Sequence, residues 1–179
     1  MSAICFAPEV VAASRDPLVR LTLGPNDEPR GAVAAVRVAA TPERVWTIIR
    51  DVEAYPSRIP MIDKVKVEGD RLTMRLAFRI ALFTARFGYT ATLTRDEGRS
   101  LEVHYESGEP RDLHLRFDLV PTPDGDGTLL YVASGFDLST LGWLVKFFLR
   151  HHPEIRYGVY PGSSLALLDS IRRAAEAPG

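Results

Sequence analysis

Large apolar residues alternate with polar ones through the middle of the chain. In residues 72–80 every even position is large and apolar, whereas the odd positions hold threonine, arginine and alanine. Such alternation is typical of a strand with one buried and one solvated face. The pattern recurs in three further segments, 86–94, 101–106 and 113–119, and residues 128–138 form one more apolar segment. We therefore expect a meander of antiparallel strands from residue 72 to residue 138.

A strand and a helix precede this meander. Residues 32–39 have the composition of a strand, and the following Thr-Pro-Glu at 41–43 has the form of a helix start. It offers a hydroxyl cap, a proline at the first helical position and an acid near the positive end of the helix dipole. Apolar residues then recur at helical spacing up to Val52. We expect a helix with one buried face, a stop at Tyr55-Pro56, and a valine-rich strand after it.

A second helix is clearest near the C-terminus, from Ser163 onward, where apolar and charged residues occupy opposite sides. Ser163 and Ser164 fit the role of helix caps. Pro161 lies directly before them, and proline inside a helix costs about 3 kcal/mol or more. We therefore expect a kink or a loop at residues 157–162.

The first 30 residues are the least regular part of the chain. Residues 18–23 alternate loosely and could form one short extra strand, and residues 24–29 have the composition of a turn. A chain of 179 residues is one ordinary domain. We therefore divide it into an N-terminal extension, residues 1–30, and a single ligand-binding domain, residues 31–179.

Residues 34–67 combine several short motifs: a strand, Thr-Pro-Glu-Arg-Val-Trp, an aspartate, Tyr-Pro, a further proline and a valine-rich strand. The motifs lie at positions 41–46, 51, 55–56, 60 and 65–67. This pattern resembles the opening of the START-like superfamily. That group includes START lipid-transfer domains, polyketide cyclase/dehydrase proteins, coenzyme-Q-binding proteins and the birch-pollen-allergen family. Residues 141–176 look similar to the end of a START lipid-binding domain.

The resemblance covers residues 31–176 and implies an α+β helix-grip fold. In this fold a curved, seven-stranded antiparallel sheet wraps around a long C-terminal helix, with an apolar cavity between the two. The resemblance is specific for the fold and weak for the function, because the superfamily hosts binders, transporters and enzymes alike.

Composition and charge narrow the classes of function. Basic and acidic side chains nearly cancel, at 22 against 23, so no basic stripe is available for a nucleic-acid backbone. The single cysteine, Cys5, excludes an intramolecular disulfide and a cysteine-based metal cluster. His151 and His152 would point about 100° apart on a helix, and no acidic cluster lies beside them, so we expect no metal and no cofactor. Without a secretory signal, we expect a cytoplasmic protein, peripheral to a membrane at most.

The inward faces of the expected strands predict the lining of the cavity. Only Tyr89 and Tyr105 bring a polar group to it. Their hydroxyls either reach the backbone or water, or orient the single polar group of a ligand such as a sterol or a quinone. The ligand-binding residues that we expect are Met74, Leu76, Phe78, Phe87, Tyr89, Tyr105, Leu115, Phe117 and Leu168. No residue is assigned a catalytic role.

Residues 143–149, Trp-Leu-Val-Lys-Phe-Phe-Leu, are unusually apolar for so short a stretch. They cannot span a bilayer, which takes about 20 apolar residues, and they show no clean polar face. They could pack on the sheet, form a dimer surface, or close the cavity entrance while basic neighbours meet anionic lipid headgroups. For a gate we expect Trp143, Phe147, Phe148 and Tyr160, with transient membrane contact through residues 143–150. The chain would then be a monomer or a weak dimer.

Three functions fit these patterns. We favour cofactor-free binding and transport of a lipophilic small molecule, such as a sterol, isoprenoid, quinone or acyl lipid, because inward polar groups are nearly absent. A polyketide aromatase/cyclase acting on a poly-β-ketone chain would need an inward arginine, but the strand phases place Arg75, Arg79, Arg86 and Arg116 outside. The third function is a non-catalytic partner of another protein, with residues 143–149 as the interface.

Overall fold

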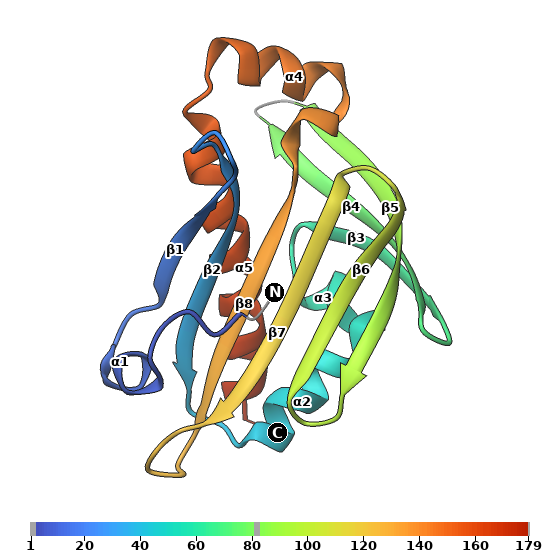
Figure 1. The fold of residues 1–179 in the computed structure, drawn as a ribbon. Coiled ribbons are helices and arrows are strands. Elements are labelled where there is room, and N and C mark those ends of the chain that lie inside the picture. The colour runs from blue at the N-terminus through green and yellow to red at the C-terminus, as the bar shows by residue number, and fades with distance from the viewer. Residues whose placement is uncertain (1–2, 81–82, 179) are drawn as a thin grey trace.

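The computed structural model describes residues 3–80 and 83–178, in which one antiparallel sheet curls around a long C-terminal helix, α5 (Ile155–Glu176) (Figure 1). The strands lie in the order β1-β2-β8-β7-β6-β5-β4-β3. Their bounds are β1 (Leu18–Leu23), β2 (Pro29–Val38), β3 (Ile62–Glu68), β4 (Arg71–Ile80), β5 (Phe83–Asp96), β6 (Ser100–Gly108), β7 (Arg111–Pro121) and β8 (Thr128–Asp137). The expected α+β helix-grip architecture is thus confirmed.

Among the described residues the sheet has the seven strands expected for the helix-grip fold and one more, at residues 18–23, where the sequence suggested a short extra strand. The eighth strand is β1, which pairs antiparallel with β2, Leu18 lying opposite Ala35. It forms one edge of the sheet, and β3 forms the other. The N-terminal extension therefore contributes directly to the sheet.

Six helical segments accompany α5 among the described residues. Three lie between β2 and β3 and are short, so they cover only the end of the sheet near the α5 C-terminus (Figure 1). The segments are α1 (Pro8–Ala13), α2 (Pro42–Arg50), η1 (Val52–Ala54), α3 (Tyr55–Arg58), η2 (Leu138–Thr140) and α4 (Gly142–His151). The start of α2 is as expected, since the Thr41 side chain accepts a hydrogen bond from the Arg44 amide and Pro42 is the first helical residue.

For residues 157–162 we expected a kink or a loop, and the loop is wrong because helix α5 runs without a break through Pro161. Tertiary contacts offset the cost of the proline here. The hydroxyl of Tyr160 donates to the carbonyl of Phe136 on β8 at 2.9 Å, and the two rings lie edge to face with centroids 5.3 Å apart. Ser163 and Ser164 are consequently interior residues of the helix, and their expected role as caps is also wrong.

The concave face of the sheet forms the main core with α5. On β4, Leu72, Met74 and Leu76 are buried, whereas Thr73 and Arg75 are exposed. The same alternation continues on the neighbouring strands, as their sequence pattern predicts. The core side of α5 contributes the buried residues Leu167, Leu168 and Ile171.

The convex face of β2 and β8 is covered by the N-terminal segment, residues 3–13. The amide of Ala3 donates to the carboxylate of Asp118 on β7 at 3.0 Å, and Tyr131 on β8 donates to the carbonyl of Phe6 at 3.3 Å. Together with apolar residues of β2 and β8, this segment forms a second, smaller core. Strand β8 is therefore buried on both faces.

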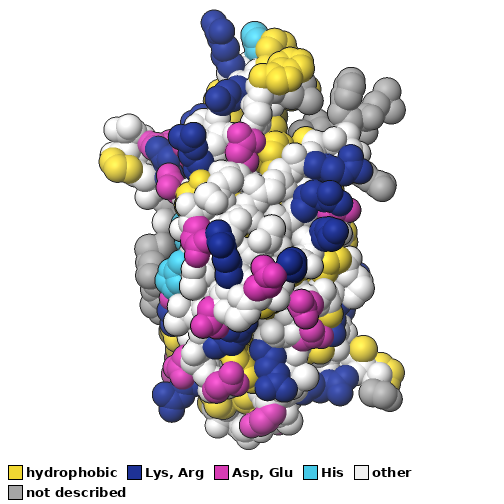
Figure 2. Space-filling view, turned by 90° about the vertical axis from the view of Figure 1, so that its right-hand side faces the viewer, with side chains coloured by type: hydrophobic (Ala, Val, Ile, Leu, Met, Phe, Trp, Pro, Cys, Tyr) yellow, Lys and Arg dark blue, Asp and Glu magenta, His cyan; other side chains and the backbone are white. Residues whose placement is uncertain are grey.

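The remaining convex face, over β3 to β7, carries charged side chains of both signs (Figure 2). Arg116 lies 2.8 Å from Glu102 and 2.8 Å from Asp118, and Arg75 lies 2.6 Å from Asp63. The exposed pair of Arg75 and Asp63 contributes a fraction of a kcal/mol, whereas Arg116 and Asp118 form a partly buried pair, with 8% of the Asp118 side chain exposed. They keep the outer face of the sheet solvated.

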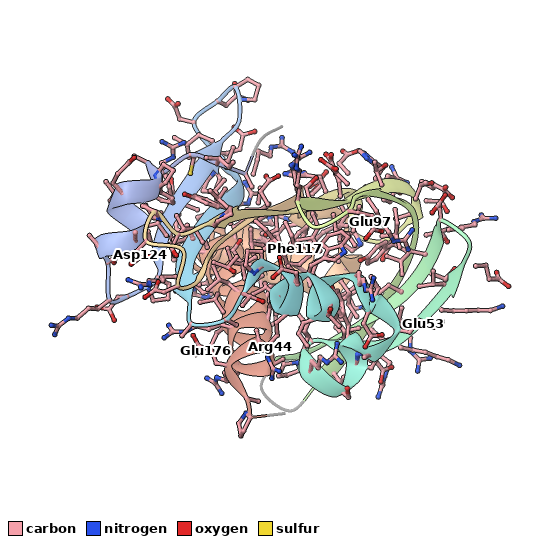
Figure 3. All side chains as sticks on the ribbon, turned by 90° about the horizontal axis from the view of Figure 1, so that it is seen from below. Arg44, Glu53, Glu97, Phe117, Asp124 and Glu176 are labelled. Carbon is pink, nitrogen blue, oxygen red and sulfur yellow. The ribbon has the colours of Figure 1, made fainter. Side chains whose placement is uncertain are left out.

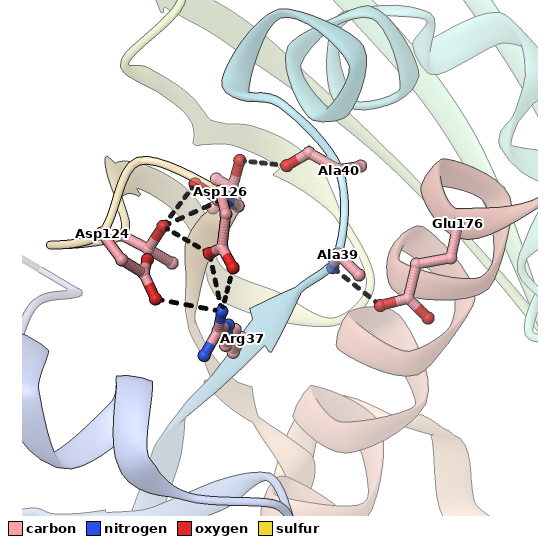
Figure 4. Close-up of polar contacts among 9 residues, drawn as sticks. Arg37, Ala39, Ala40, Asp124, Asp126 and Glu176 are labelled. Carbon is pink, nitrogen blue, oxygen red and sulfur yellow. Dashed lines mark hydrogen bonds and ion pairs between the residues drawn. The ribbon is translucent and has the colours of Figure 1, made fainter.

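The end of the molecule near the α5 C-terminus is held by polar side chains, seen from below in Figure 3. The guanidinium of Arg44 on α2 donates to the carbonyls of Ala175 and Ala177 at the end of α5. The carboxylate of Glu176 accepts from the amide of Ala39 at 2.9 Å (Figure 4). These contacts satisfy backbone groups that helix ends leave without partners. They fix α2 and the end of β2 against α5.

An ion-pair cluster closes the β7–β8 turn at the same end. The guanidinium of Arg37 on β2 contacts Asp124 at 3.2 Å and Asp126 at 2.6 Å (Figure 4). Hydrogen bonds from Thr122 and Asp126, helped by the charge of Arg37, lower the pKa of Asp124 to about 2. Both carboxylates are exposed, so the cluster orders the turn more than it stabilises the fold.

Candidate ligand-binding site

A small apolar cavity lies between the concave face of the sheet and α5, with a volume of about 50 Å³. Strands β4, β5, β7 and β8, the start of β3 and one side of α5 all contribute to its wall. The lining residues are Met61, Ile62, Met74, Leu76, Tyr89, Leu113, His114, Leu115, Ser134, Phe136, Ser163 and Leu167. Pockets for drug-sized ligands usually measure about 300–1,000 Å³. A sterol or quinone ring system therefore cannot enter until this cavity widens.

The structure brings four of the expected ligand-binding residues together at this cavity: Met74, Leu76, Tyr89 and Leu115. Four others lie elsewhere. Phe87, Phe117 and Leu168 are buried in the core but do not line the cavity. Tyr105 is half-buried beside the core, and its hydroxyl donates to the carbonyl of Gly108 at 3.0 Å. The side chain of Phe78 lies outside the described residues.

Tyr89 is the only one of the two expected tyrosines at the cavity. Its hydroxyl lies 3.0 Å from the sulfur of Met74, a weak hydrogen-bond acceptor. Burial raises the pKa of the Tyr89 phenol well above its ordinary value. The group stays protonated, so it can donate a hydrogen bond to a carbonyl or hydroxyl but does not act as a base near neutral pH.

A pair of serines forms a second polar point at the cavity, which the strand pattern did not reveal. The hydroxyl oxygens of Ser134 on β8 and Ser164 on α5 lie 2.8 Å apart, and the Ser164 hydroxyl also donates to the carbonyl of Ala32 at 3.4 Å. Ser164 is fully buried, and Ser134 lines the cavity. Phe136, two residues along β8, was missed for the same reason. Because β8 is apolar on both faces, its sequence does not show which residues point inward.

Charged groups are scarce in the lining. Within the described residues it contains no carboxylate, guanidinium or ammonium group. His114 borders the cavity, but its ring lies against Gly135, where a Cβ atom would come within 2.3 Å of it. Burial lowers the pKa of His114, so the ring is neutral near pH 7. Arg75, Arg86 and Arg116 all lie near acidic partners on the outer face.

Helix α4 lies across the end of the molecule where β4 and β5 meet and α5 begins (Figure 1). Leu149 joins the main core with 6% of its surface exposed, and Val145 packs against that core. Trp143 and Phe147 instead project outward, with 78% and 53% of their surfaces exposed. The helix is therefore anchored by one face and presents two large aromatic side chains on the other.

The four expected gate residues thus have different surroundings. Trp143 and Phe147 are exposed on α4, and Phe148 is half-buried with its ring centroid 6.0 Å from that of Phe147. Tyr160 is buried on α5, where it lines a separate groove of about 400 Å³. This groove is polar and is bounded by the β1–β2 turn, Arg30 at the start of β2, the end of β8, η2 and the start of α5.

Comparison with protein families shows to which family the chain belongs. The family model described as polyketide cyclase / dehydrase and lipid transport matches residues 38–153, which is more than half of the chain. The chain belongs to this family. The match runs from α2 to α4 and includes every strand that contributes to the cavity wall, and it ends before α5. A comparison with curated proteins gave no match.

Three solved structures similar to this polyketide cyclase/dehydrase and lipid-transport family member show the range of the fold. A START superfamily protein from Mycobacterium smegmatis has a TM-score of 0.62 and 19% identity, covering 80% of this chain and 95% of its own. The Zhui aromatase/cyclase from Streptomyces sp. R1128 has a TM-score of 0.59 and 20% identity, covering 89% and 94%. A STAR-related lipid transfer protein from Xanthomonas axonopodis has a TM-score of 0.55 and 16% identity, covering 92% and 96%.

These similarities confirm the expected START-like fold. At 16–20% identity they establish the fold alone, and the compared proteins include both a lipid transfer protein and an aromatase/cyclase. No helix of the described chain is long and apolar enough to cross a membrane.

Proposed function

We propose that this protein is a cofactor-free carrier that binds a lipophilic small molecule between its sheet and α5. The observation that supports this function best is the cavity lining, which is apolar apart from the His114 ring and hydroxyls that already have partners within the protein. Transfer of an apolar ligand from water to such a wall stabilises the complex by about 25 cal/mol per Å² of apolar area buried. Tyr89 and Ser134 would orient the one polar group of the ligand.

The size of the cavity makes movement part of this proposal. A pocket of about 50 Å³ has to widen before a sterol, isoprenoid, quinone or acyl chain can enter. We assign this movement to α4, which begins at Gly142, with a positive φ of 53°, and ends directly before His152-Pro153. The opening would displace Leu149 and Phe148 from the end of the core, and Trp143, Phe147 and Tyr160 would border the entrance.

The test is native mass spectrometry of the purified protein after incubation with sterol, quinone and phospholipid fractions. Leu76→Trp places a large side chain in the cavity, and Thr73→Trp places the same side chain on the exposed face of the same strand. A carrier should retain a stoichiometric lipid adduct that Leu76→Trp abolishes and Thr73→Trp preserves. If no fraction yields an adduct, or if both variants lose it equally, the carrier function is wrong.

The alternative function, a polyketide aromatase/cyclase, has less support from the site. It would need a cationic side chain in the cavity to assist enolisation of a poly-β-ketone chain. The described arginines of β4, β5 and β7 lie on the outer face, and the raised pKa of Tyr89 leaves it a donor only. Turnover of a poly-β-ketone substrate that is lost in Tyr89→Phe would favour the enzyme over the carrier.

A further inference from the structure

The outer face of α4 is the most prominent exposed apolar feature of the described chain. Trp143 and Phe147 lie one helical turn apart, with 78% and 53% of their surfaces exposed. Ile155 and Tyr157, at the start of the next helix, α5, are exposed as well. Single exposed apolar residues are common on proteins, but several large ones on adjoining helical turns indicate an interaction surface.

Basic residues accompany these aromatic side chains. Residues 138–160 contain three of them, Lys146, Arg150 and Arg156, and one acidic residue, Glu154, in a chain whose formal net charge is -1. Glu154 is engaged by His152, with a distance of 3.0 Å between the ring nitrogen and the carboxylate. Figure 2 shows hydrophobic and basic side chains gathered at this end of the molecule. The α4 end is thus locally positive on a protein that is otherwise nearly neutral.

A second copy of the chain is a poor match for this face. A ten-residue helix is about 15 Å long and about 10 Å wide, so one face of it covers roughly 150 Å². A stable dimer interface buries about 800 Å² on each partner, several times this area. A two-fold contact through α4 would also bring the basic side chains of both copies together. A lipid bilayer with anionic headgroups has neither difficulty, because its charge is opposite and its surface adapts to a short helix.

We infer that the outer face of α4 is a docking site for the anionic surface of a lipid bilayer. The rings of Trp143 and Phe147 enter the headgroup region, where tryptophan is enriched in proteins that contact membranes. Lys146 and Arg150 meet lipid phosphates beside them. The core-facing residues Val145 and Leu149 remain attached to the protein. This contact does not require the cavity, so it goes beyond the carrier function and can fail while that function stands.

The experiment uses the intrinsic fluorescence of the full chain without any added cavity ligand. The protein has two tryptophans: Trp46 is 5% exposed and donates to Glu97 at 2.8 Å, whereas Trp143 faces solvent. Vesicles of equal parts phosphatidylcholine and phosphatidylglycerol should shift the emission to the blue and sediment with the protein. Vesicles of phosphatidylcholine alone should bind at least tenfold more weakly, and salt should reduce binding to the anionic vesicles. Trp143→Phe should remain bound while the spectral shift disappears.

Two kinds of variant test the residues. Each of Lys146→Gln and Arg150→Gln should weaken vesicle binding about fivefold, the equivalent of about 1 kcal/mol per basic residue. Phe147→Ser should weaken it at least as much. Val10→Ser is the matched control, because Val10 is 54% exposed on α1, far from α4 in Figure 1, and binding should not change.

The following results would overturn the inference. One is the absence of sedimentation with both kinds of vesicle. Another is equal binding to neutral and anionic vesicles, or an equal loss in Val10→Ser and Phe147→Ser. A concentration-dependent doubling of mass without vesicle binding would assign the face to a second copy instead.

Discussion

The hydroxyl pair between β8 and α5 gives a stability prediction that can be worked from distances. In Ser164→Ala, the hydroxyl of Ser134 loses its partner at 2.8 Å. A buried polar group without a partner costs about 1–3 kcal/mol. Ser134 borders a cavity of about 50 Å³, which is large enough to admit a water molecule. We therefore expect the low end, a loss of about 1 kcal/mol in the free energy of unfolding.

The reverse change should cost more. In Ser134→Ala, the fully buried Ser164 retains only its long, 3.4 Å contact with the carbonyl of Ala32, so we expect a loss of about 1–2 kcal/mol. The double variant removes both hydroxyls together, so neither position keeps a hydroxyl without a hydrogen-bond partner. Its loss should therefore not exceed that of Ser134→Ala, which gives a coupling energy of about 1 kcal/mol.

Equilibrium urea unfolding, followed by circular dichroism, measures these differences in the free energy of unfolding. In thermal unfolding, a loss of 1 kcal/mol should lower the Tm by about 2–4 °C in a chain of this size. Ser163→Ala is the control, because its hydroxyl bonds within α5 to the carbonyl of Tyr160 at 2.9 Å, and it should change stability by less than about 0.5 kcal/mol. Additive losses in the double variant would refute the direct pairing of Ser134 and Ser164.

Two further predictions concern the turns. The pKa of Asp124 lies at about 2, below its ordinary value of 3.8, so the contribution of this carboxylate to stability is complete above about pH 4 and disappears as the pH falls towards 2. Asp124→Asn should therefore make the Tm fall less steeply with pH on the acid side. An unchanged slope would contradict the role of Thr122 and the neighbouring charges. At the end of β6, Gly108 has a φ of 104°, and an added Cβ would lie 2.3 Å from the carbonyl oxygen of Gly88. Gly108→Ala should therefore cost more than about 2 kcal/mol in thermal unfolding, whereas Gly98→Ala, with open space around it, should cost about 1 kcal/mol.

The strands with one buried and one solvent-exposed face were predictable from the sequence. On β4 the hydrophobic effect sorts Leu72, Met74 and Leu76 inward, and Thr73 and Arg75 outward, so the pattern contains the phase of the strand. The same reasoning on β4, β5 and β7 predicted four of the cavity residues. The helix start at Thr41 was equally legible, because its cap is a local interaction.

The parts that depend on distant contacts were not predictable. Strand β8 is apolar on both faces because residues 3–13 cover its convex side, so the inward direction of Ser134 has no signature in the sequence. Pro161 breaks helices by local rules, but the contact of Tyr160 with β8 keeps α5 continuous. The volume of the cavity depends on how side chains from six elements fit together, and no local pattern encodes it.

The N-terminal segment that covers β8, residues 3–13, also constrains the order in which the chain can acquire its structure. Ala3 is held by Asp118, a separation of 115 residues, and Phe6 by Tyr131, a separation of 125 residues. Residues 3–13 leave the ribosome before β7 and β8 exist, so they have no surface on which to settle until the sheet is synthesised. Contacts of such long range form slowly. During translation this segment, with Cys5 and Phe6, is thus exposed to chaperones and to the surrounding solution for longer than any other part of the described sheet and its cover.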